Sequence, residues 1–290
     1  MHTAKIWISA ARPKTLAAGI SPVLLGTAQA LSKGFFDPLL FLMTLLTALG
    51  IQITTNFAND YFDFQKGADT EKRKGPLRVM QAGLVSIPDM KKAIAISIAS
   101  TALIGSYLIL QGGLPIFLLL SLALILAILY TAGPYPIAYI GLGDLFVLVF
   151  FGPVAVGGTF FLQTGILNIE PILAGMALGA ISAEVLSINN LRDVEEDKIA
   201  NKKTLIVRFG KQFGKVKYVV SLAFAALIPL FFFQSHPLTL LAELFLLPAI
   251  PCIRQVLLEE NSKNLNSILV KTGQLVLIYA TLFSIGILLC

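Results

Sequence analysis

Two stretches of the sequence place carboxylate and carboxamide side chains together where a long apolar run ends. We call them the first array (Asn56, Asn59, Asp60 and Asp63) and the second array (Asn189, Asn190, Asp193 and Asp197). Each residue of an α-helix turns about 100°, so the members of each array fall within an arc of about 100°. Residues three and four apart are neighbours on a helix surface. Each array therefore points its oxygen-bearing groups in one direction.

Carboxylates held side by side repel each other and raise one another's pKa, which a bound cation relieves. Oxygen ligands suit Mg²⁺, which typically binds one or two carboxylates together with substrate phosphates. The alternative is that both arrays are ordinary solvated helix ends. Because two arrays of similar composition occur, we favour a Mg²⁺ site. Its predicted ligands are Asn59, Asp60, Asp63, Asp193 and Asp197.

Lysine and arginine residues follow each array, and three of them are close enough in sequence to share its site. These are Lys66, Arg78 and Lys198. Cations beside a metal site suit a diphosphate, which spreads its charge over many oxygens. The alternative is that these residues only hold positive charge on one side of a membrane.

The elements that carry the arrays are membrane helices. Of the 290 residues, 56% are hydrophobic and only 13% are charged, whereas a soluble domain carries about 25% charge. The apolar runs are continuous, which excludes a disordered chain and a β-barrel. We predict an all-α polytopic membrane protein, one domain over residues 1–290, with about nine transmembrane helices. The predicted spans are 17–31, 39–59, 93–110, 114–130, 145–162, 171–191, 219–233, 238–253 and 268–289.

The basic residues predict the orientation of these helices. With nine spans, 21 of the 22 lysines and arginines fall on the side of the N-terminus, and Lys33 alone falls opposite. Positive charge is retained in the cytoplasm, so we expect a cytoplasmic N-terminus. The net charge of +6 then reflects topology, and no nucleic-acid partner is expected. The first apolar run also has features of a cleaved signal peptide, but it is long enough to span.

The two arrays also indicate an internal duplication. Asp60 and Asp193 lie on the second and sixth predicted helices, which run in the same direction with three helices between them. A parallel repeat differs from the inverted repeats common in secondary transporters. Two further classes nevertheless stay open, a cation-coupled transporter with Asp ion sites and a non-catalytic assembly factor.

The arrays resemble those of the UbiA-type intramembrane polyprenyltransferases. That family carries Asn-Asp-x-x-Asp on the second helix and Asp-x-x-x-Asp on the sixth, as residues 59–63 and 193–197 do here. Within the family the chain looks most like the branch that prenylates 1,4-dihydroxy-2-naphthoate in menaquinone synthesis. The stretches that carry this closer resemblance are 11–15, 75–78, 81–83, 130–134, 151–156 and 189–193.

The resemblance implies a reaction and its partners. A polyprenyl diphosphate would lie in the bundle with its tail accessible to lipid. Mg²⁺ held by the Asp arrays would bind the diphosphate. An aromatic acceptor would attack the allylic cation and lose its carboxyl group as CO₂. The acceptor could instead be 4-hydroxybenzoate or another aromatic acid. The quinone pathway implies a bacterial inner membrane, while protein partners are not indicated.

Two tyrosines and one glutamate carry polar groups within or beside the predicted spans. Tyr61 and Tyr130 are candidates for contact with the isoprenoid or the acceptor, although tyrosine also favours the membrane interface. Glu184 interrupts the sixth helix on a face away from the second array. An intramembrane glutamate is a functional candidate, but pairing across helices would also explain it. We therefore leave Glu184 outside the predicted site.

Overall fold

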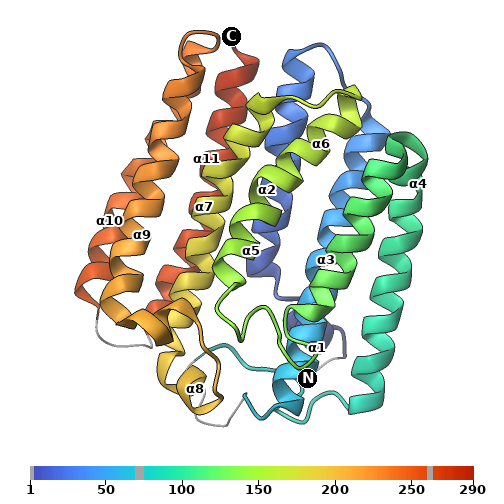
Figure 1. Cartoon of the computed structure of the whole chain (residues 1–290), viewed down its shortest axis with the longest axis vertical. Coiled ribbons are helices and arrows are strands. Elements are labelled where there is room, and N and C mark those ends of the chain that lie inside the picture. Colours follow the sequence, from blue (N-terminus) through green and yellow to red (C-terminus); the bar gives the residue numbers. More distant parts are fainter. Residues whose placement is uncertain (1–2, 69–74, 260–263) are drawn as a thin grey trace.

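The computed structural model describes residues 3–68, 75–259 and 264–290, and these form helices joined by short loops. The long helices stand side by side (Figure 1). In chain order the elements are α1 (Thr3–Ala11), α2 (Pro13–Ser32), α3 (Pro38–Gln65), α4 (Ile87–Leu129), α5 (Gly143–Val149), η1 (Phe150–Val154), α6 (Ala155–Thr164), α7 (Ile169–Arg192), α8 (Val194–Ile199), α9 (Leu205–Phe232), η2 (Pro237–Phe245), α10 (Leu246–Leu258) and α11 (Leu265–Leu288).

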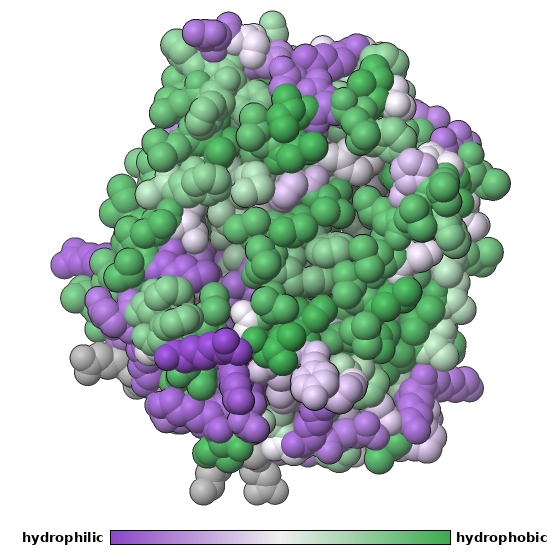
Figure 2. Space-filling view, viewed as in Figure 1, coloured by the Kyte–Doolittle hydropathy of each residue, from purple (hydrophilic) through white to green (hydrophobic). Residues whose placement is uncertain are grey.

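Eight of the described helices are long and apolar enough to cross a membrane. The longest, α4, has 43 residues, and its backbone leaves the helical region at Gly113 (φ 64°, ψ −152°). Glycine adopts a positive φ without steric cost, and Figure 1 shows α4 turning back on itself. Counting the two arms of α4 separately gives the nine spans that the sequence predicts. Figure 2 shows a broad apolar surface between two more hydrophilic ends.

The helix directions agree with the predicted topology. α3 and α7 run the same way, so both arrays lie at the end of the bundle that also holds the N-terminus (Figure 1). Lys33 follows α2 at the other end and pairs there with Glu170, at 3.1 Å between Nζ and Oε2.

One predicted boundary is wrong. The span expected to begin at residue 219 belongs to α9, which begins at Leu205, so Lys217 lies within a helix and not in a connector. Its charge does not end the span because buried carboxylates neutralise it, with Nζ 2.7 Å from Glu184. Glu184 is thus paired across helices, one of the two explanations that the sequence allowed.

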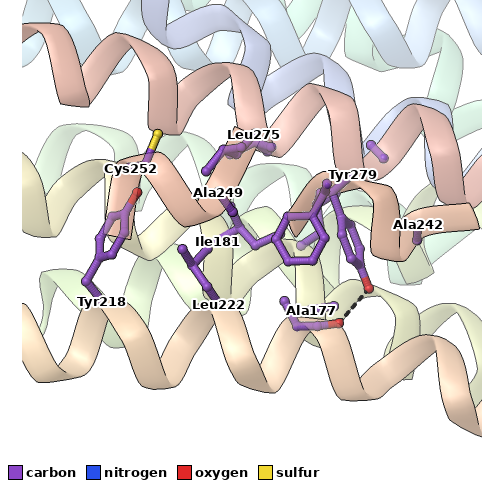
Figure 3. Packing of buried hydrophobic residues seen from close by; sticks show 14 of the residues in the cluster. Ala177, Ile181, Tyr218, Leu222, Ala242, Ala249, Cys252, Leu275 and Tyr279 are labelled. Carbon is purple, nitrogen blue, oxygen red and sulfur yellow. Dashed lines mark hydrogen bonds between the residues drawn. The ribbon is translucent and has the colours of Figure 1, made fainter. Parts of the chain in front are cut away.

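α7 is the centre of the bundle, and it packs against α2, α5, η1, α6, α9 and α11. On one side it joins α9, η2, α10 and α11 in the largest hydrophobic cluster (Figure 3). Two buried tyrosines in that cluster satisfy their hydroxyls: Tyr279 donates to the Ala225 carbonyl, and Tyr218 shares a hydrogen bond with Thr272, both at 2.9 Å. The side of α7 that faces α9 and α11 is therefore filled with packed side chains.

On its other side, α7 lies very close to α5 and η1. A Cβ added to Gly179 would collide with the backbone carbonyl of Leu148, and one added to Gly175 would lie 2.7 Å from the Gly152 carbonyl carbon. The backbones of α7 and of the α5–η1 segment are therefore in direct contact at Gly175 and Gly179. The opposing segment is a π-helix that contains Pro153, and such bulges often mark functional sites.

We predict that Gly179→Ala destabilises the protein by about 1–3 kcal/mol, the usual cost of overpacking. The backbone atoms that its methyl group meets cannot rotate away. Gly157→Ala is the matched control, since its added Cβ would have only an ordinary contact at 3.4 Å. Thermal unfolding in detergent measures both. Equal midpoints for the two variants would contradict the close packing of α7 on α5.

Candidate active site

The carboxamides of the first array are held by segments distant in sequence. Asn56 Nδ2 donates to the Ala11 carbonyl at 2.9 Å and to Thr15 Oγ1 at 3.2 Å, which ties α3 to the start of α2. Thr131 Oγ1 donates to Asn59 Oδ1 at 3.0 Å. The two amides therefore orient α3 between the N-terminal segment and the loop after α4.

The carboxylates of the first array are buried near cationic and hydroxyl groups. Asp60 is only 1% exposed, and its Oδ2 accepts from the Val79 amide at 3.3 Å. Asp63 accepts from the Tyr139 hydroxyl at 2.9 Å and lies 3.7 Å from an Arg78 guanidinium nitrogen. The segment from residue 75 onward thus folds back over the end of α3. It places Arg78, which we predict to bind the diphosphate, beside the first array.

The second array spans a bend that the sequence does not predict. α7 ends at Arg192, and Asp193 (φ −97°, ψ 12°) separates it from α8. Helical hydrogen bonds continue on both sides of the bend, from the Asp193 amide to the Asn189 carbonyl at 3.0 Å and from the Asp197 amide to the Asp193 carbonyl at 2.8 Å. The array therefore keeps its helical spacing although it is not on one continuous helix.

Arg192 holds the second array in place. Its Nε and one terminal nitrogen each donate to a different Asp193 oxygen at 2.6 Å, a bidentate pair. The remaining donors reach Asn189 and, on α11, Asn266 at 2.8 Å. Arg192 is 1% exposed, so its charge is neutralised within this network.

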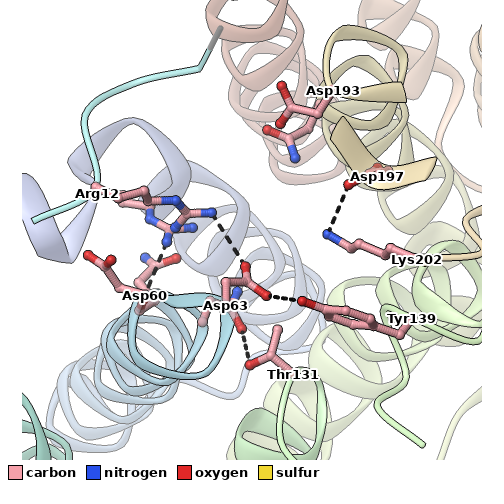
Figure 4. Close-up of polar contacts among 12 residues, drawn as sticks. Arg12, Asp60, Asp63, Thr131, Tyr139, Asp193, Asp197 and Lys202 are labelled. Atoms are coloured by element: carbon pink, nitrogen blue, oxygen red, sulfur yellow. Dashed lines mark hydrogen bonds and ion pairs between the residues drawn. The ribbon is translucent and has the colours of Figure 1, made fainter. Parts of the chain in front are cut away.

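The loop after α4 lies between the two arrays, as Figure 4 shows. The ring of Tyr139 is contacted by two lysines, Lys66 at 4.6 Å and Lys202 at 5.4 Å from its centroid. Lys202 also pairs with Asp197 at 3.6 Å, while the Tyr139 hydroxyl bonds to Asp63. One aromatic ring thus connects the cations and carboxylates of both arrays.

A cavity of about 540 Å³ opens beside the arrays. Its polar end is lined by members of both arrays together with Arg12, Arg192 and Lys202, and its other end by apolar side chains of α4, α5 and η1. The predicted site residues that line the cavity are Asn56, Asn59, Asp63, Arg78, Tyr130, Asn189 and Asn190. Asp193 and Asp197 bond to the lining residues Arg192 and Lys202, and Lys66 bonds to the carbonyl of Thr131. Asp60 bonds to the amide of Val79, which follows Arg78.

Two predicted site residues point elsewhere. Tyr61 packs in a small hydrophobic cluster with Phe57 and Met90, and its hydroxyl accepts from Gln65 at 2.6 Å. Lys198 is exposed and pairs with Glu195 at 3.3 Å. Neither residue lines the cavity, so a role for either in substrate binding stays a prediction without support from this geometry.

The donor set fits a divalent cation that takes part of its coordination from a substrate. Within residues 3–68, 75–259 and 264–290, no three His, Cys, Asp or Glu side chains are grouped closely enough to hold an ion. Asp60 Oδ1 is buried and has no hydrogen-bond partner in the described part of the chain. An unpaired buried carboxylate oxygen is costly, and it is the kind of ligand that Mg²⁺ prefers.

Lys66, beside the arrays, has perturbed acidity. Burial lowers the pKa of Lys66, and the negative charge of Asp63 opposes this effect. Lys66 Nζ donates to the Thr131 carbonyl at 2.7 Å, so the side chain is fixed beside the arrays.

Several residues at the site are not among those predicted from the sequence. They are Arg12, Tyr139, Asp144, Arg192, Lys202 and, behind the cavity wall, Lys217. An ionisable residue within an apolar segment is a functional candidate, but Asp144 and Lys217 lie just before the predicted spans 145–162 and 219–233 and therefore resemble connector residues. No local pattern identifies Tyr139, whose role arises only because its loop folds between two distant helices.

Comparisons with known proteins agree with this geometry. Residues 19–288 match the model of the UbiA prenyltransferase family. The chain is 39% identical to a Haemophilus influenzae protein over 98% of this chain and 96% of the relative, and 39% identical to an Escherichia coli protein over 98% and 95%. Both relatives are named 1,4-dihydroxy-2-naphthoate octaprenyltransferase.

The fold is also similar to that of a solved UbiA homologue from Archaeoglobus fulgidus bound to GPP and Mg²⁺. The TM-score is 0.60 at 17% identity, covering 98% of this chain and all of the other. The comparisons do not support the transporter alternative. The chain is an integral membrane enzyme that belongs to the UbiA prenyltransferase family.

Proposed function

We propose that this protein transfers a polyprenyl group from a polyprenyl diphosphate to 1,4-dihydroxy-2-naphthoate, with release of diphosphate and CO₂, to form a demethylmenaquinone. The names and full-length similarity of the two bacterial relatives support the choice of acceptor. The observation that carries the reaction type is the pair of buried acidic arrays at the polar end of an apolar cavity.

The polar end suits the diphosphate. Arg78 lies beside Asp63, and Lys202 lies beside Asp197. Lys66 contacts the ring of Tyr139, and Arg12 faces the first array (Figure 4). Bound Mg²⁺, held by Asp60, Asp63, Asp193 and Asp197 with Asn59, would stabilise the negative charge that develops on the leaving diphosphate. The basic side chains stabilise the same charge from the protein side.

The apolar end suits the prenyl chain and the cation that forms on it. Phe146 and Phe150 stack at 4.5 Å between ring centroids, and Tyr130 lies 5.6 Å from Phe146. These rings line the cavity and exclude water, which would otherwise capture an allylic cation. We infer that residues 1–290 act as one catalytic domain, because α3, α7 and the loop between α4 and α5 all contribute to one cavity.

We also propose that the N-terminus and both arrays face the cytoplasm of a bacterial inner membrane. The distribution of lysine and arginine supports this orientation, since among the described residues only Lys33 lies at the far end of the bundle. A cytoplasmic site would meet the soluble aromatic acid there and the prenyl diphosphate from the bilayer.

The first test offers two acceptors in parallel to purified protein in liposomes with Mg²⁺ and octaprenyl diphosphate. We expect a prenylated, decarboxylated product from 1,4-dihydroxy-2-naphthoate and none from 4-hydroxybenzoate, as identified by mass. Product from the benzoate alone would change the acceptor but keep the mechanism. Absence of product from both acceptors, with folded protein, would refute the proposed function.

The second test removes one carboxylate from each array. Asp60→Asn and Asp197→Asn should each lower kcat at least about 100-fold, because each loses a group that stabilises the leaving charge. Glu195→Gln is the control, since this exposed neighbour of the second array pairs with the surface residues Lys198 and Lys211. Near-normal turnover in either Asp variant would remove that array from the proposed Mg²⁺ site.

The third test concerns orientation and uses the exposed native Cys290, since Cys252 is buried. A membrane-impermeant maleimide should label Cys290 in intact spheroplasts. In the double variant Cys290→Ser/Lys5→Cys, labelling should require permeabilised membranes, because residue 5 lies at the opposite end of the bundle. The reverse pattern would place the arrays outside the cytoplasm.

A further inference from the structure

A buried ionic cluster lies behind the middle of the cavity wall. Lys217 Nζ on α9 is 2.7 Å from Asp144 Oδ1 on α5, 2.7 Å from Glu184 Oε1 on α7 and 2.6 Å from Ser187 Oγ. Ser187 also donates to Asp144 Oδ1 at 3.1 Å. Three helices thus meet at one lysine, and two carboxylates face a single positive charge.

The cluster is asymmetric with respect to the cavity. Asp144 lines it, whereas Glu184 and Lys217 do not, and Glu184 is fully buried. Charged groups inside a membrane bundle are costly and are kept where they serve a purpose. Lys217 and Ser187 both grip Oδ1, so the carboxylate of Asp144 is fixed in position at the cavity wall.

An unpartnered hydroxyl lines the same cavity. Ser182 on α7 is 2% exposed, and its Oγ has no hydrogen-bond partner in the described residues. A helical serine commonly bonds to the carbonyl four residues earlier, but this one does not. A buried hydroxyl without a partner costs stability unless a ligand completes it.

Flat aromatic side chains line the same cavity as Asp144 and Ser182. Phe146 follows Asp144 by two residues and stacks with Phe150, and the Tyr130 hydroxyl approaches Gly143 so closely that an added Cβ there would lie 3.0 Å from it. The wall therefore combines a ring-sized apolar face with one fixed hydrogen-bond acceptor and one free donor.

We propose that this part of the wall binds the aromatic acceptor, with Asp144 accepting a hydrogen bond from a ring hydroxyl and Ser182 donating to a second oxygen of the acceptor. The ring lies against Phe146. Lys217 is a positioning residue that keeps Asp144 in place, and Glu184 holds Lys217 from α7 at 2.7 Å. A ring hydroxyl bonded to a carboxylate donates more electron density to the ring, which favours attack on the allylic cation. The inference rests on the proposed prenylation of a hydroxylated aromatic acid.

The test measures steady-state kinetics for each substrate separately. Ser182→Ala, which removes only an unpaired hydroxyl, should raise KM for the naphthoate about three- to tenfold, and Asp144→Asn should lower kcat/KM for the naphthoate about tenfold or more. KM for the polyprenyl diphosphate should change less than the constants for the naphthoate in both variants, since neither group contacts the diphosphate at the polar end.

Two controls separate binding from structure. Ser284→Ala removes another buried, unpartnered hydroxyl that does not line the cavity, and Asp89→Asn makes the same charge change at an exposed site. Both should leave acceptor KM unchanged. If Ser182→Ala behaves like Ser284→Ala, and Asp144→Asn behaves like Asp89→Asn, the wall does not bind the acceptor.

A measurement on the wild-type protein avoids any folding defect. Competitive inhibition by 1-hydroxy-2-naphthoate should be at least about tenfold stronger than by 1-methoxy-2-naphthoate, because a site built around a hydroxyl donor rejects its methyl ether. Asp144→Asn should reduce this preference. Equal inhibition of the wild type by both compounds would overturn the inference, whereas failure to prenylate any aromatic acid would instead refute the proposed function.

Discussion

Carboxylates within an apolar bundle must be neutralised, and the rest of the structure depends on how this protein does so. Asp193 is neutralised by the preceding residue, the buried Arg192, and Asp63 by a tyrosine hydroxyl and Arg78. Asp60 retains an oxygen with no partner in the described residues. With most of the carboxylate charge compensated, the bundle can fold. The negative charge that remains on Asp60 would be compensated by a metal ion bound together with a diphosphate.

The bundle serves this requirement by giving α7 two different sides. The side that faces α9 and α11 is packed with apolar residues and satisfied tyrosine hydroxyls, so it is rigid. The other side lines the cavity, first with amides at the polar end and then with Ser182 deeper in. Because glycines let α5 and η1 approach α7 closely, Asp144 and the phenylalanine rings stand beside that second side. A single helix thus aligns the diphosphate end with the proposed acceptor wall.

Much of this architecture could be predicted from sequence, because membrane helices must be long, apolar and flanked by charges on one side. The helix class, the nine spans and the arrays as polar helix ends all depend on such local rules. The positions of the residues between the arrays do not follow from such local rules. Tyr139 lies in a loop whose position is set by distant helices, and Arg192 looks like an ordinary basic residue at a helix end. Lys217 was misplaced because charge was read as the end of a span, whereas here two buried acids compensate it.

We propose that neither array holds the metal alone and that the diphosphate completes the site. This can be measured as Mn²⁺ binding, followed by electron paramagnetic resonance, with and without a non-reactive thiolodiphosphate analogue of the prenyl substrate. We expect weak Mn²⁺ binding to the protein alone and affinity at least about tenfold higher with the analogue, lost in Asp60→Asn and in Asp197→Asn. Tight binding without the analogue, or binding that both substitutions leave unchanged, would contradict it.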